Sequence, residues 1–169
     1  MMNTKIYKHF LHLFLLLLLT LFWIGCGKDN GTGPVVDTNP TGTMTFTLNG
    51  GGFTNKAITL KTAIARYDVE EQMTAIFAAG VLETDSIVCG LVFPGNRTGT
   101  FVWSTPENGF GIVLSQQNVY LPLSGTTTVS SYGPVGSTVS GSFSGKIIRM
   151  GTYDTVTVSN GQFSARHIQ

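Results

Sequence analysis

The stretch TMTFTLNGGGF, residues 43–53, shows the pattern that decides the fold. Its apolar side chains, Met44, Phe46 and Leu48, alternate strictly with threonines. A period of two places every second side chain on one face of a β-strand, whereas a helix would bring together residues three or four apart. The asparagine–glycine pair that follows is typical of a tight hairpin turn. The stretch therefore predicts a strand with one buried and one solvated face that ends in a hairpin.

The same alternation runs through most of the chain after residue 43. The apolar sides of three further expected strands are Ile58, Leu60 and Ile64; Val139, Phe143 and Ile147; and Val156 and Val158. Short turn signals separate the strands: Asn49-Gly50, Pro94-Gly95-Asn96, Pro106-Glu107-Asn108-Gly109, Gly133-Pro134 and Asn160-Gly161. Two segments, 72–79 and 86–93, are apolar on both faces, which predicts central strands.

The expected fold is all-β, because no window has a capped stretch of helical period long enough to form a substantial helix. About nine or ten short strands joined by tight turns are typical of an antiparallel β-sandwich or a flattened barrel. Residues 43–169 are enough for one such domain, which would bury roughly two-thirds of its unfolded surface. A second domain is not expected.

Residues 1–25 have the pattern of a secretory signal peptide. Lys5 and Lys8 precede an apolar stretch from Phe10 to Ile24, and a small residue follows it. The alternative is a membrane-spanning helix. Fifteen residues that rise about 1.5 Å each would span about 22 Å, which is shorter than the ~30 Å hydrocarbon core of a bilayer. We therefore expect the first 25 residues to be a leader that is removed.

The end of this leader, Trp23-Ile24-Gly25-Cys26, resembles a bacterial lipobox. In a lipobox the cysteine thiol is acylated and the chain is cut just before it, after a small residue. Gly25 and Cys26 meet both needs, although Trp23 stands where lipoboxes usually have leucine. Two or three acyl chains, at ~0.8 kcal/mol for each buried methylene, would anchor the protein stably in a membrane. If the leader is cut elsewhere, Cys26 has no such role.

A polar segment separates the cysteine from the expected domain. Residues 26–42 are mostly glycine, proline, asparagine, aspartate and threonine. Such a composition buries too little apolar surface to compensate for the entropy lost on ordering. We expect this segment to be a flexible, lipidated tether.

Charge and cysteine content exclude several classes of function. Loss of Lys5 and Lys8 with the leader leaves eight Lys and Arg residues against nine Asp and Glu, a net charge of −1. Without a basic stripe, nucleic-acid binding is not expected. With Cys26 acylated, Cys89 has no partner for an intramolecular disulfide, and its apolar neighbours predict a buried, unreactive thiol.

Histidine is too scarce for the usual catalytic or metal sites. His9 and His12 leave with the leader, and His167 lies so near the C-terminus that we expect it to fray. One histidine and one cysteine cannot build a zinc site, and no histidine is expected beside a nucleophile. The acids in RYDVEEQM and LETDSI, residues 66–73 and 82–87, are expected in solvated hairpin loops. We therefore expect no enzyme activity, no metal and no cofactor.

Trp103 is the tryptophan that remains after the leader is removed, and it shares a strand face with Phe101. If that face is exposed, Trp103 could stack on a sugar ring while Glu107 and Asn108 bind its hydroxyls. The alternative, which we favour, is that Trp103 fills the core at the end of a strand. The choice depends on the exposure of the side chain.

The second half of the chain, GTTTVSSYGPVGSTVSGSFSGKIIRMGTYDTVTVSNGQFSARHI (125–168), resembles the last strands of small Bacteroidetes-type lipoproteins. These carry a β domain of unknown function. The matching pieces are Gly125-Thr126, Val139-Ser140-Gly141-Ser142-Phe143, Val156, Val158, Asn160-Gly161 and Phe163, with TFTLNGGGF and Gly99-Thr100-Phe101 earlier in the chain. The resemblance implies the fold and a place in the outer membrane, but no activity and no functional residues.

Two features tied to that bacterial group stay open. Lys28-Asp29, soon after the lipid cysteine, resembles a short form of its signal for export to the cell surface. The triplets that begin with Asp85-Ser86 and Asp154-Thr155 resemble its acceptor motif for O-glycosylation, although patterns this short also occur by chance.

The sequence thus leads us to expect a lipid-anchored protein of the bacterial cell envelope with a non-catalytic binding or structural role. The membrane would be contacted through the lipid on Cys26. A glycan or an envelope protein is the expected partner. The alternative is a surface lipoprotein that binds a glycan or small ligand and serves an outer-membrane transporter.

Overall fold

The structure of the protein, a computed structural model, describes residues 42–103, 108–115 and 118–169. In these ranges the chain forms nine strands and no helix, which confirms the all-β prediction. The strands are β1 (Gly42–Gly50), β2 (Phe53–Asp68), β3 (Met73–Leu82), β4 (Asp85–Pro94), β5 (Gly99–Val102), β6 (Gly109–Leu114), β7 (Asn118–Tyr132), β8 (Thr138–Arg149) and β9 (Thr155–His167).

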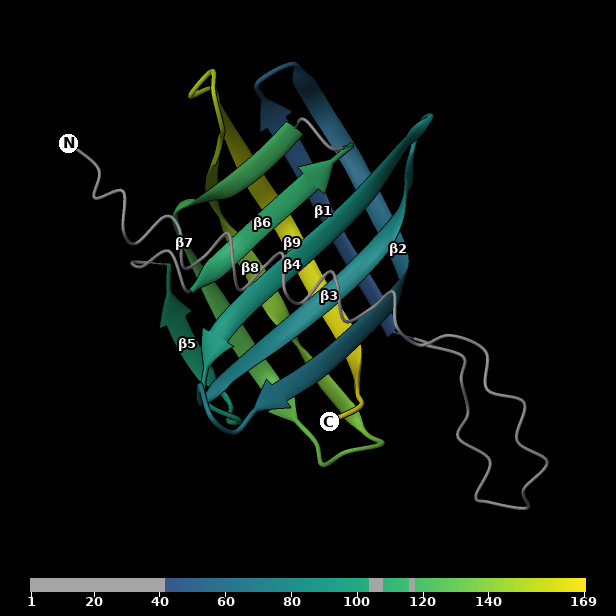
Figure 1. The fold of residues 1–169 in the computed structure, drawn as a ribbon, viewed down its shortest axis with the longest axis vertical. Coiled ribbons are helices and arrows are strands. Elements are labelled where there is room, and N and C mark those ends of the chain that lie inside the picture. The colour runs from purple at the N-terminus through teal and green to yellow at the C-terminus, as the bar shows by residue number, and fades with distance from the viewer. Residues whose placement is uncertain (1–41, 104–107, 116–117) are drawn as a thin grey trace. The chain divides into compact units, whose positions relative to one another are not determined.

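The strands form one sheet that closes on itself, as Figure 1 shows. Around the ring the order is β7-β6-β4-β3-β2-β1-β9-β8, and β8 pairs again with β7. The early part of β7, Asn118–Tyr120, pairs with β6, and its later part, Thr126–Val129, pairs with β5. The ring therefore has eight strands. β5 and β6 share one place in it, because they pair with successive parts of the same edge of β7. Of the two predicted architectures, the barrel describes this closed sheet best.

Inward-facing side chains fill the barrel. Met44, Phe46 and Leu48 of β1 are buried, as their alternation predicted, and so are the predicted apolar residues of β8 and β9. Phe46 packs edge-on against Phe110, with ring centroids 5.1 Å apart, and Phe110 lies 4.6 Å from Phe143. Burying a side chain of this kind contributes about 1.5–3 kcal/mol to folding, so the aromatic centre is a main source of stability.

β2 departs from the predicted alternation at a bulge. Met44 pairs with Leu60, whereas Gly42 pairs with Ala63, so two steps along β1 face three steps along β2. One extra residue shifts every later side chain to the opposite face of the sheet. Ala63 therefore faces the core and is fully buried, and Ile64 is half-buried on the outside. The prediction that Ile64 continues the buried face of β2 is wrong.

A second bulge replaces a predicted turn. β9 runs unbroken from Thr155 to His167, through Asn160-Gly161. Against β1 its register shifts at this pair, where two steps on β1 face three on β9. Asn160 has φ 54°, a left-handed conformation that asparagine adopts more readily than most residues. Asn160-Gly161 is thus a β-bulge inside a strand. The prediction of a hairpin turn at this pair is wrong.

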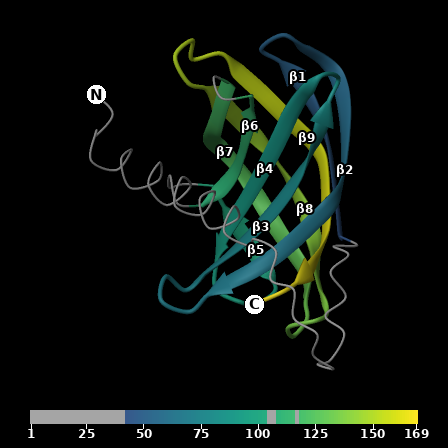
Figure 2. The same ribbon diagram turned by 45° about the vertical axis from the view of Figure 1, so that its right-hand side comes forward.

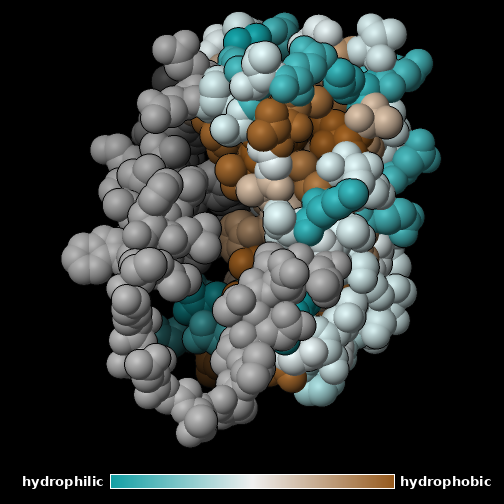
Figure 3. Space-filling model, turned by 90° about the vertical axis from the view of Figure 1, so that its right-hand side faces the viewer, coloured by the Kyte–Doolittle hydropathy of each residue, from teal (hydrophilic) through white to brown (hydrophobic). Residues whose placement is uncertain are grey.

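The outer surface of the barrel has a polar and an apolar side. The outward residues of β1, β8 and β9 are mainly serine and threonine, whereas β3 and β4 also carry apolar residues outward. These two strands contain residues 73–79 and 86–93 of the two apolar segments and lie inside the sheet, as predicted for central strands. Because the sheet is a single layer, their second apolar face points out of the barrel, and Val81 is 71% exposed. Figure 3 shows apolar residues at the surface on the side where β2 and β3 lie in Figure 1.

The strand connections gather at two ends of the barrel, and one end combines three loops with the C-terminus. We call this end the mouth; it consists of residues 69–72, 95–98, 133–137 and 167–169. In Figures 1 and 2 it is the lower end, marked by the C-terminus. The opposite end carries the β1–β2, β3–β4 and β8–β9 turns.

Candidate functional site

The structure places Trp103 in the core. Its side chain is 3% exposed, and the indole Nε1–H donates to Thr127 Oγ1 over 2.8 Å. Its ring lies tilted against Phe110, with centroids 6.3 Å apart. An indole this buried has no free face for a sugar ring, and its polar atom already has a partner. The stacking role considered for Trp103 is therefore corrected to a packing role at the end of β5.

Two glycines make room for this indole. Gly125 of β7 and Gly145 of β8 are directly paired across the ladder. A Cβ atom on either residue would come within 2.5 Å of the indole ring of Trp103. It would come still closer to a backbone carbonyl oxygen, at 2.4 Å from Ser144 for residue 125 and 2.3 Å from Ser124 for residue 145, so both the ring and the paired backbone require glycine here. The site around Trp103 is thus filled by the protein itself.

The other predicted site residues lie partly outside the described part of the chain. The amide Nδ2 of Asn108 donates to the carbonyl oxygen of Val102 over 2.8 Å, and its Oδ1 is buried without a hydrogen-bond partner among the described residues. Glu107 lies outside the described residues. The lipidation and cleavage residues, Gly25 and Cys26, also lie outside them.

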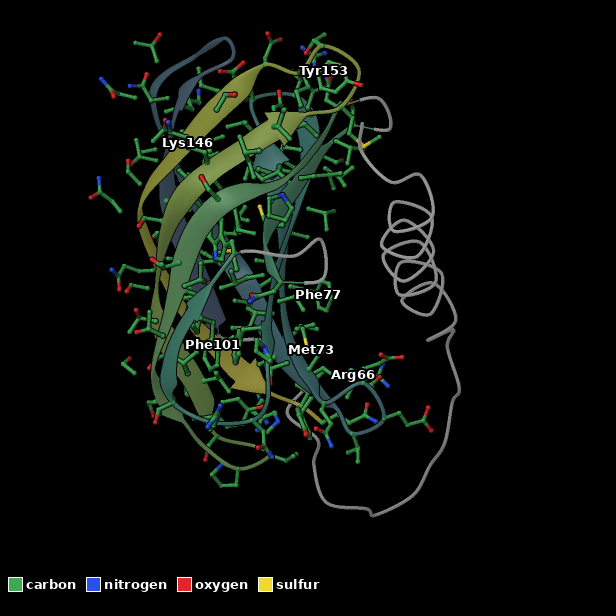
Figure 4. All side chains as sticks on the ribbon, turned by 90° about the vertical axis from the view of Figure 1, so that its left-hand side faces the viewer. Arg66, Met73, Phe77, Phe101, Lys146 and Tyr153 are labelled. Carbon is green, nitrogen blue, oxygen red and sulfur yellow. The ribbon has the colours of Figure 1, made fainter. Side chains whose placement is uncertain are left out.

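A hollow of about 820 Å³ lies at the mouth, and we call it the mouth pocket. Its walls come from residues 66–70 at the end of β2, Asn96 in the β4–β5 loop, residues 132–135 in the β7–β8 loop, and the C-terminal residues His167 and Gln169. Figure 4 labels Arg66 beside the β2–β3 hairpin at this end and Tyr153 at the opposite end. Four segments far apart in the sequence thus meet around one concave surface.

His167 is held firmly in this wall. It is 6% exposed, and β9 extends through it to pair in parallel with β2, where His167 lies opposite Ala65. Its backbone N–H donates to the carbonyl of Ser137 over 2.8 Å, and its carbonyl accepts from the N–H of Gly136 over 2.8 Å. The prediction of a frayed terminal histidine is wrong. β1 pairs with β2 only as far as Ala63, and from Ile64 onward the end of β9 pairs with β2 instead, which holds His167 in place.

The two ring nitrogens of His167 have different surroundings. Nδ1 lies 2.8 Å from the carbonyl oxygen of Gly133. Since a carbonyl can only accept, Nδ1 carries the proton in this hydrogen bond. In the neutral ring, Nε2 then presents a lone pair. Nε2 is buried and has no hydrogen-bond partner among the residues that the structure describes. Leaving a buried polar atom unpaired costs about 1–3 kcal/mol, which is a cost that a ligand donor would remove.

Tyr132 fixes the orientation of the histidine ring. The two rings are packed edge to face, with centroids 5.2 Å apart and planes at 76°. The hydroxyl of Thr74 lies 2.6 Å from the carbonyl of Gly95, to which it donates, and 2.9 Å from the hydroxyl of Tyr132. Tyr132 therefore donates to Thr74 in turn. Burial raises the pKa of the Tyr132 phenol. This chain of hydrogen bonds ties three segments of the mouth together.

The mouth pocket carries charges of both signs. Arg66 contributes a cation, and Asp68 and Glu70 contribute carboxylates. Asp68 Oδ1 also shapes the β2–β3 turn, because it accepts from the backbone N–H groups of Glu70 and Glu71 over 2.9 and 3.1 Å. The Nε atom of Arg66, like Nε2 of His167, is buried without a hydrogen-bond partner among the described residues.

Cys89 and Glu83, which the sequence analysis also considered, do not line the mouth pocket. Cys89 is fully buried, as predicted, and burial raises the pKa of its thiol well above the ordinary range. Glu83 lies in the β3–β4 turn and pairs with Lys56 over 2.6 Å. Among residues 42–103, 108–115 and 118–169, no three His, Cys, Asp or Glu side chains lie together as metal ligands. In the same ranges the chain has no helix long and apolar enough to cross a membrane.

Comparison with protein-family models, with curated proteins and with solved structures finds no match. The functional reading therefore depends on the geometry of the chain itself.

The mouth pocket was not predicted from the sequence, although one signal for it was present. Phe163, Ala165 and His167 follow the same two-residue period as the inward side of β9. Continuing that period would have placed the histidine inward. The partners of its ring, Gly133 and Tyr132, belong to a different hairpin, and nothing local in the sequence links them to residue 167.

Proposed function

We propose that this protein is a lipid-anchored, non-catalytic binding protein of the bacterial cell envelope, and that it holds a small ligand in the mouth pocket. The observation that carries the binding role is a hollow of about 820 Å³ beside a buried histidine whose Nε2 has no partner among the described residues. Ligand sites are commonly clefts of about 300–1,000 Å³ with a few placed polar groups, and this one fits that description.

The closed sheet supports a binding role because it supplies a rigid frame. Loops from separate strands converge at one end of the frame, where their side chains can vary without disturbing the core.

The anchor is proposed from the sequence features at residues 1–26. From Cys26 to Gly42 the chain has sixteen steps. At about 3.3–3.6 Å for each residue, sixteen steps reach at most about 53–58 Å. A lipid on Cys26 would thus keep the domain close to the membrane and still let the pocket face its surroundings.

The anchor is tested by substituting each cysteine in turn. Cys26→Ser should prevent labelling with a palmitate analogue and move the protein from the membrane to the soluble fraction. The matched control is Cys89→Ala, which removes the other cysteine and should leave both labelling and fractionation unchanged. Membrane retention of the unlabelled Cys26→Ser protein would count against the anchor.

The binding role is tested without assuming a ligand class. The full chain, purified in detergent, is melted in the presence of a small-molecule extract of the cell envelope. A ligand present at about 100 times its dissociation constant adds about 2.7 kcal/mol, or roughly 10 °C for a domain of this size. Val135→Trp, which narrows the pocket opening, should abolish the rise. A flat response of the wild-type protein would refute the binding role.

A further inference from the structure

We infer that the mouth pocket is built for a neutral, polyhydroxylated ligand, that is, a saccharide. This inference rests on the proposed binding function and deepens it, because it names the class of ligand. It assigns the site to the barrel mouth, around His167, and not to the buried Trp103.

His167 determines the first requirement on the ligand. Its Nδ1–H is already used in the hydrogen bond to Gly133, so the neutral ring can offer a ligand only the lone pair of Nε2. The complementary group is a donor, such as a hydroxyl. A fully ionised anion such as a carboxylate has no proton to give, so it does not satisfy this nitrogen while the ring is neutral. The ring cannot turn away easily, because Tyr132 packs against it at 5.2 Å.

The charges of the mouth pocket determine the second requirement. An anionic ligand would meet the carboxylates of Asp68 and Glu70, and a cationic ligand would meet the guanidinium of Arg66. With both signs present, the pocket favours a ligand without net charge that can donate and accept hydrogen bonds at many points. The amides of Asn96 and Gln169, which also line the pocket, can do both as well. Sugar hydroxyls match this mixture.

The remaining walls are apolar and aromatic. Tyr67 and Tyr132 present aromatic rings, and Pro134 and Val135 lie in the loop beside them. The two tyrosines are near enough that Tyr67 helps to raise the pKa of Tyr132. A sugar ring carries C–H groups on its faces and hydroxyls at its edges. It can therefore lie against such a wall while its hydroxyls reach the polar side chains.

The interior of the barrel argues against a lipid ligand. Phe93 and Phe101 stack with centroids 5.3 Å apart, and Phe93 and Ile76 are fully buried. Above the mouth, Thr74 is also fully buried and is hydrogen-bonded to Tyr132. Side chains thus fill the space that an acyl chain would need, and the ligand is confined to the mouth, whose lining combines polar and apolar side chains.

The experiment measures binding to the full chain, purified in detergent, by calorimetry and thermal melting. The saccharide probes are maltotriose, cellotriose, mannotriose and N-acetylchitotriose. Inorganic phosphate, spermidine and palmitate represent anions, cations and lipids. At least one saccharide should bind and raise the melting temperature, whereas the other three probes should not.

Two variants at one position test the role of Nε2. In His167→Asn the shorter amide can still donate to Gly133 but has no atom at the place of Nε2, so saccharide affinity should fall about tenfold. In His167→Gln the amide reaches the place of Nε2 and restores an acceptor, so the loss should be smaller. Tyr153→Ala, at the opposite end, is the matched control and should bind like the wild type. Melting without ligand checks that each variant is folded.

The outcomes separate the two proposals. Saccharide binding that His167→Asn leaves unchanged would overturn the assignment to the mouth pocket. Binding of phosphate, spermidine or palmitate alone, with the same dependence on His167, would overturn the saccharide class and keep the binding function. If no saccharide binds but the envelope extract stabilises the protein, the saccharide class is again overturned while the proposed function stands. If neither binds, both proposals fail.

Discussion

Trp103 and His167 are both buried aromatic rings that carry an N–H group, yet their polar atoms differ in hydrogen bonding. Trp103 is 3% exposed and its Nε1–H donates to Thr127, so its hydrogen-bonding capacity is used up. His167 is 6% exposed, but only one of its two nitrogens has a described partner. Burial alone therefore does not distinguish a packing ring from a binding ring. The two rings differ in whether every polar atom has a hydrogen-bond partner.

The two rings also differ in the space around them. Paired glycines of β7 and β8 come up against the indole of Trp103 and leave no room for another molecule. His167 instead borders the mouth pocket. The contrast suggests that loss of Trp103 acts on folding, whereas loss of His167 acts on the ligand.

The largest effect on this contrast is expected from Trp103→Ala. Removing a buried indole typically lowers the free energy of unfolding by about 3–5 kcal/mol, through lost burial and the cavity that remains. Urea unfolding followed by circular dichroism measures this change. His167→Asn should lower stability much less. Comparable losses in the two variants would break the comparison.

Gly145→Ala is expected to have the next largest effect. Its new Cβ would lie 2.3 Å from the carbonyl oxygen of Ser124 and 2.5 Å from the indole of Trp103, and overpacking of a filled core costs typically about 1–3 kcal/mol. A double-mutant cycle with Trp103→Phe separates the two contacts, because a smaller ring relieves the clash with residue 103 but not the clash with the backbone. Additive losses in the double variant would show that the backbone contact, and not the indole, requires glycine at this position.

A smaller effect is expected at high pH from Tyr132→Phe. Burial raises the pKa of Tyr132 in the folded protein, so the unfolded chain loses its phenolic proton first as pH increases. The free energy of unfolding should therefore fall once the pH passes about 10, the ordinary pKa of tyrosine. Tyr120 contributes in the same direction, so Tyr132→Phe should reduce this slope without removing it.

The matched control for Tyr132 is Tyr153→Phe, because Tyr153 is 71% exposed at the opposite end of the barrel. Chemical unfolding of the three proteins between pH 8 and 11 measures the slopes. If the free energy of unfolding falls equally steeply with pH in the wild type and in Tyr132→Phe, burial at the mouth does not raise the pKa of Tyr132.

The smallest effect is expected from Glu83→Gln, far from the mouth. Glu83 pairs with Lys56, whose hydrogen bond and positive charge lower the pKa of that carboxyl. Both side chains are exposed to solvent, which screens the pair. We expect no measurable change in the urea midpoint and none in saccharide binding. A clear change in the urea midpoint or in saccharide binding would show that this exposed ion pair contributes to stability or to the mouth pocket, contrary to our expectation.

Much of the fold was predictable because strand faces follow from local alternation. The buried sides of β1, β8 and β9 agree with the two-residue period, and burial of Cys89 agrees with the prediction from its apolar neighbours. The errors occur where one extra residue shifts the period. At Ile64 and at Asn160-Gly161 a bulge changes the register against β1, and a bulge depends on the partner strand as much as on its own residues.

The candidate site was less predictable than the fold. Trp103 was correctly favoured as a core residue, but its neighbours Gly125 and Gly145 were not linked to it by anything in the sequence. His167 was dismissed because it lies near the chain end. Its burial depends on pairing with β2, about a hundred residues earlier in the chain, and no local pattern shows such a pairing.

By itself, the sequence determined that the chain forms strands and which side of most of them is apolar, because these properties depend on near neighbours. Only the tertiary structure decided that the sheet closes through β7 and β8, and which polar atoms gain partners. Closure brings residues 66–70, 132–135 and His167 together around one hollow. Hydrogen-bond satisfaction depends on distances between such segments, so it is fixed only when the barrel is complete.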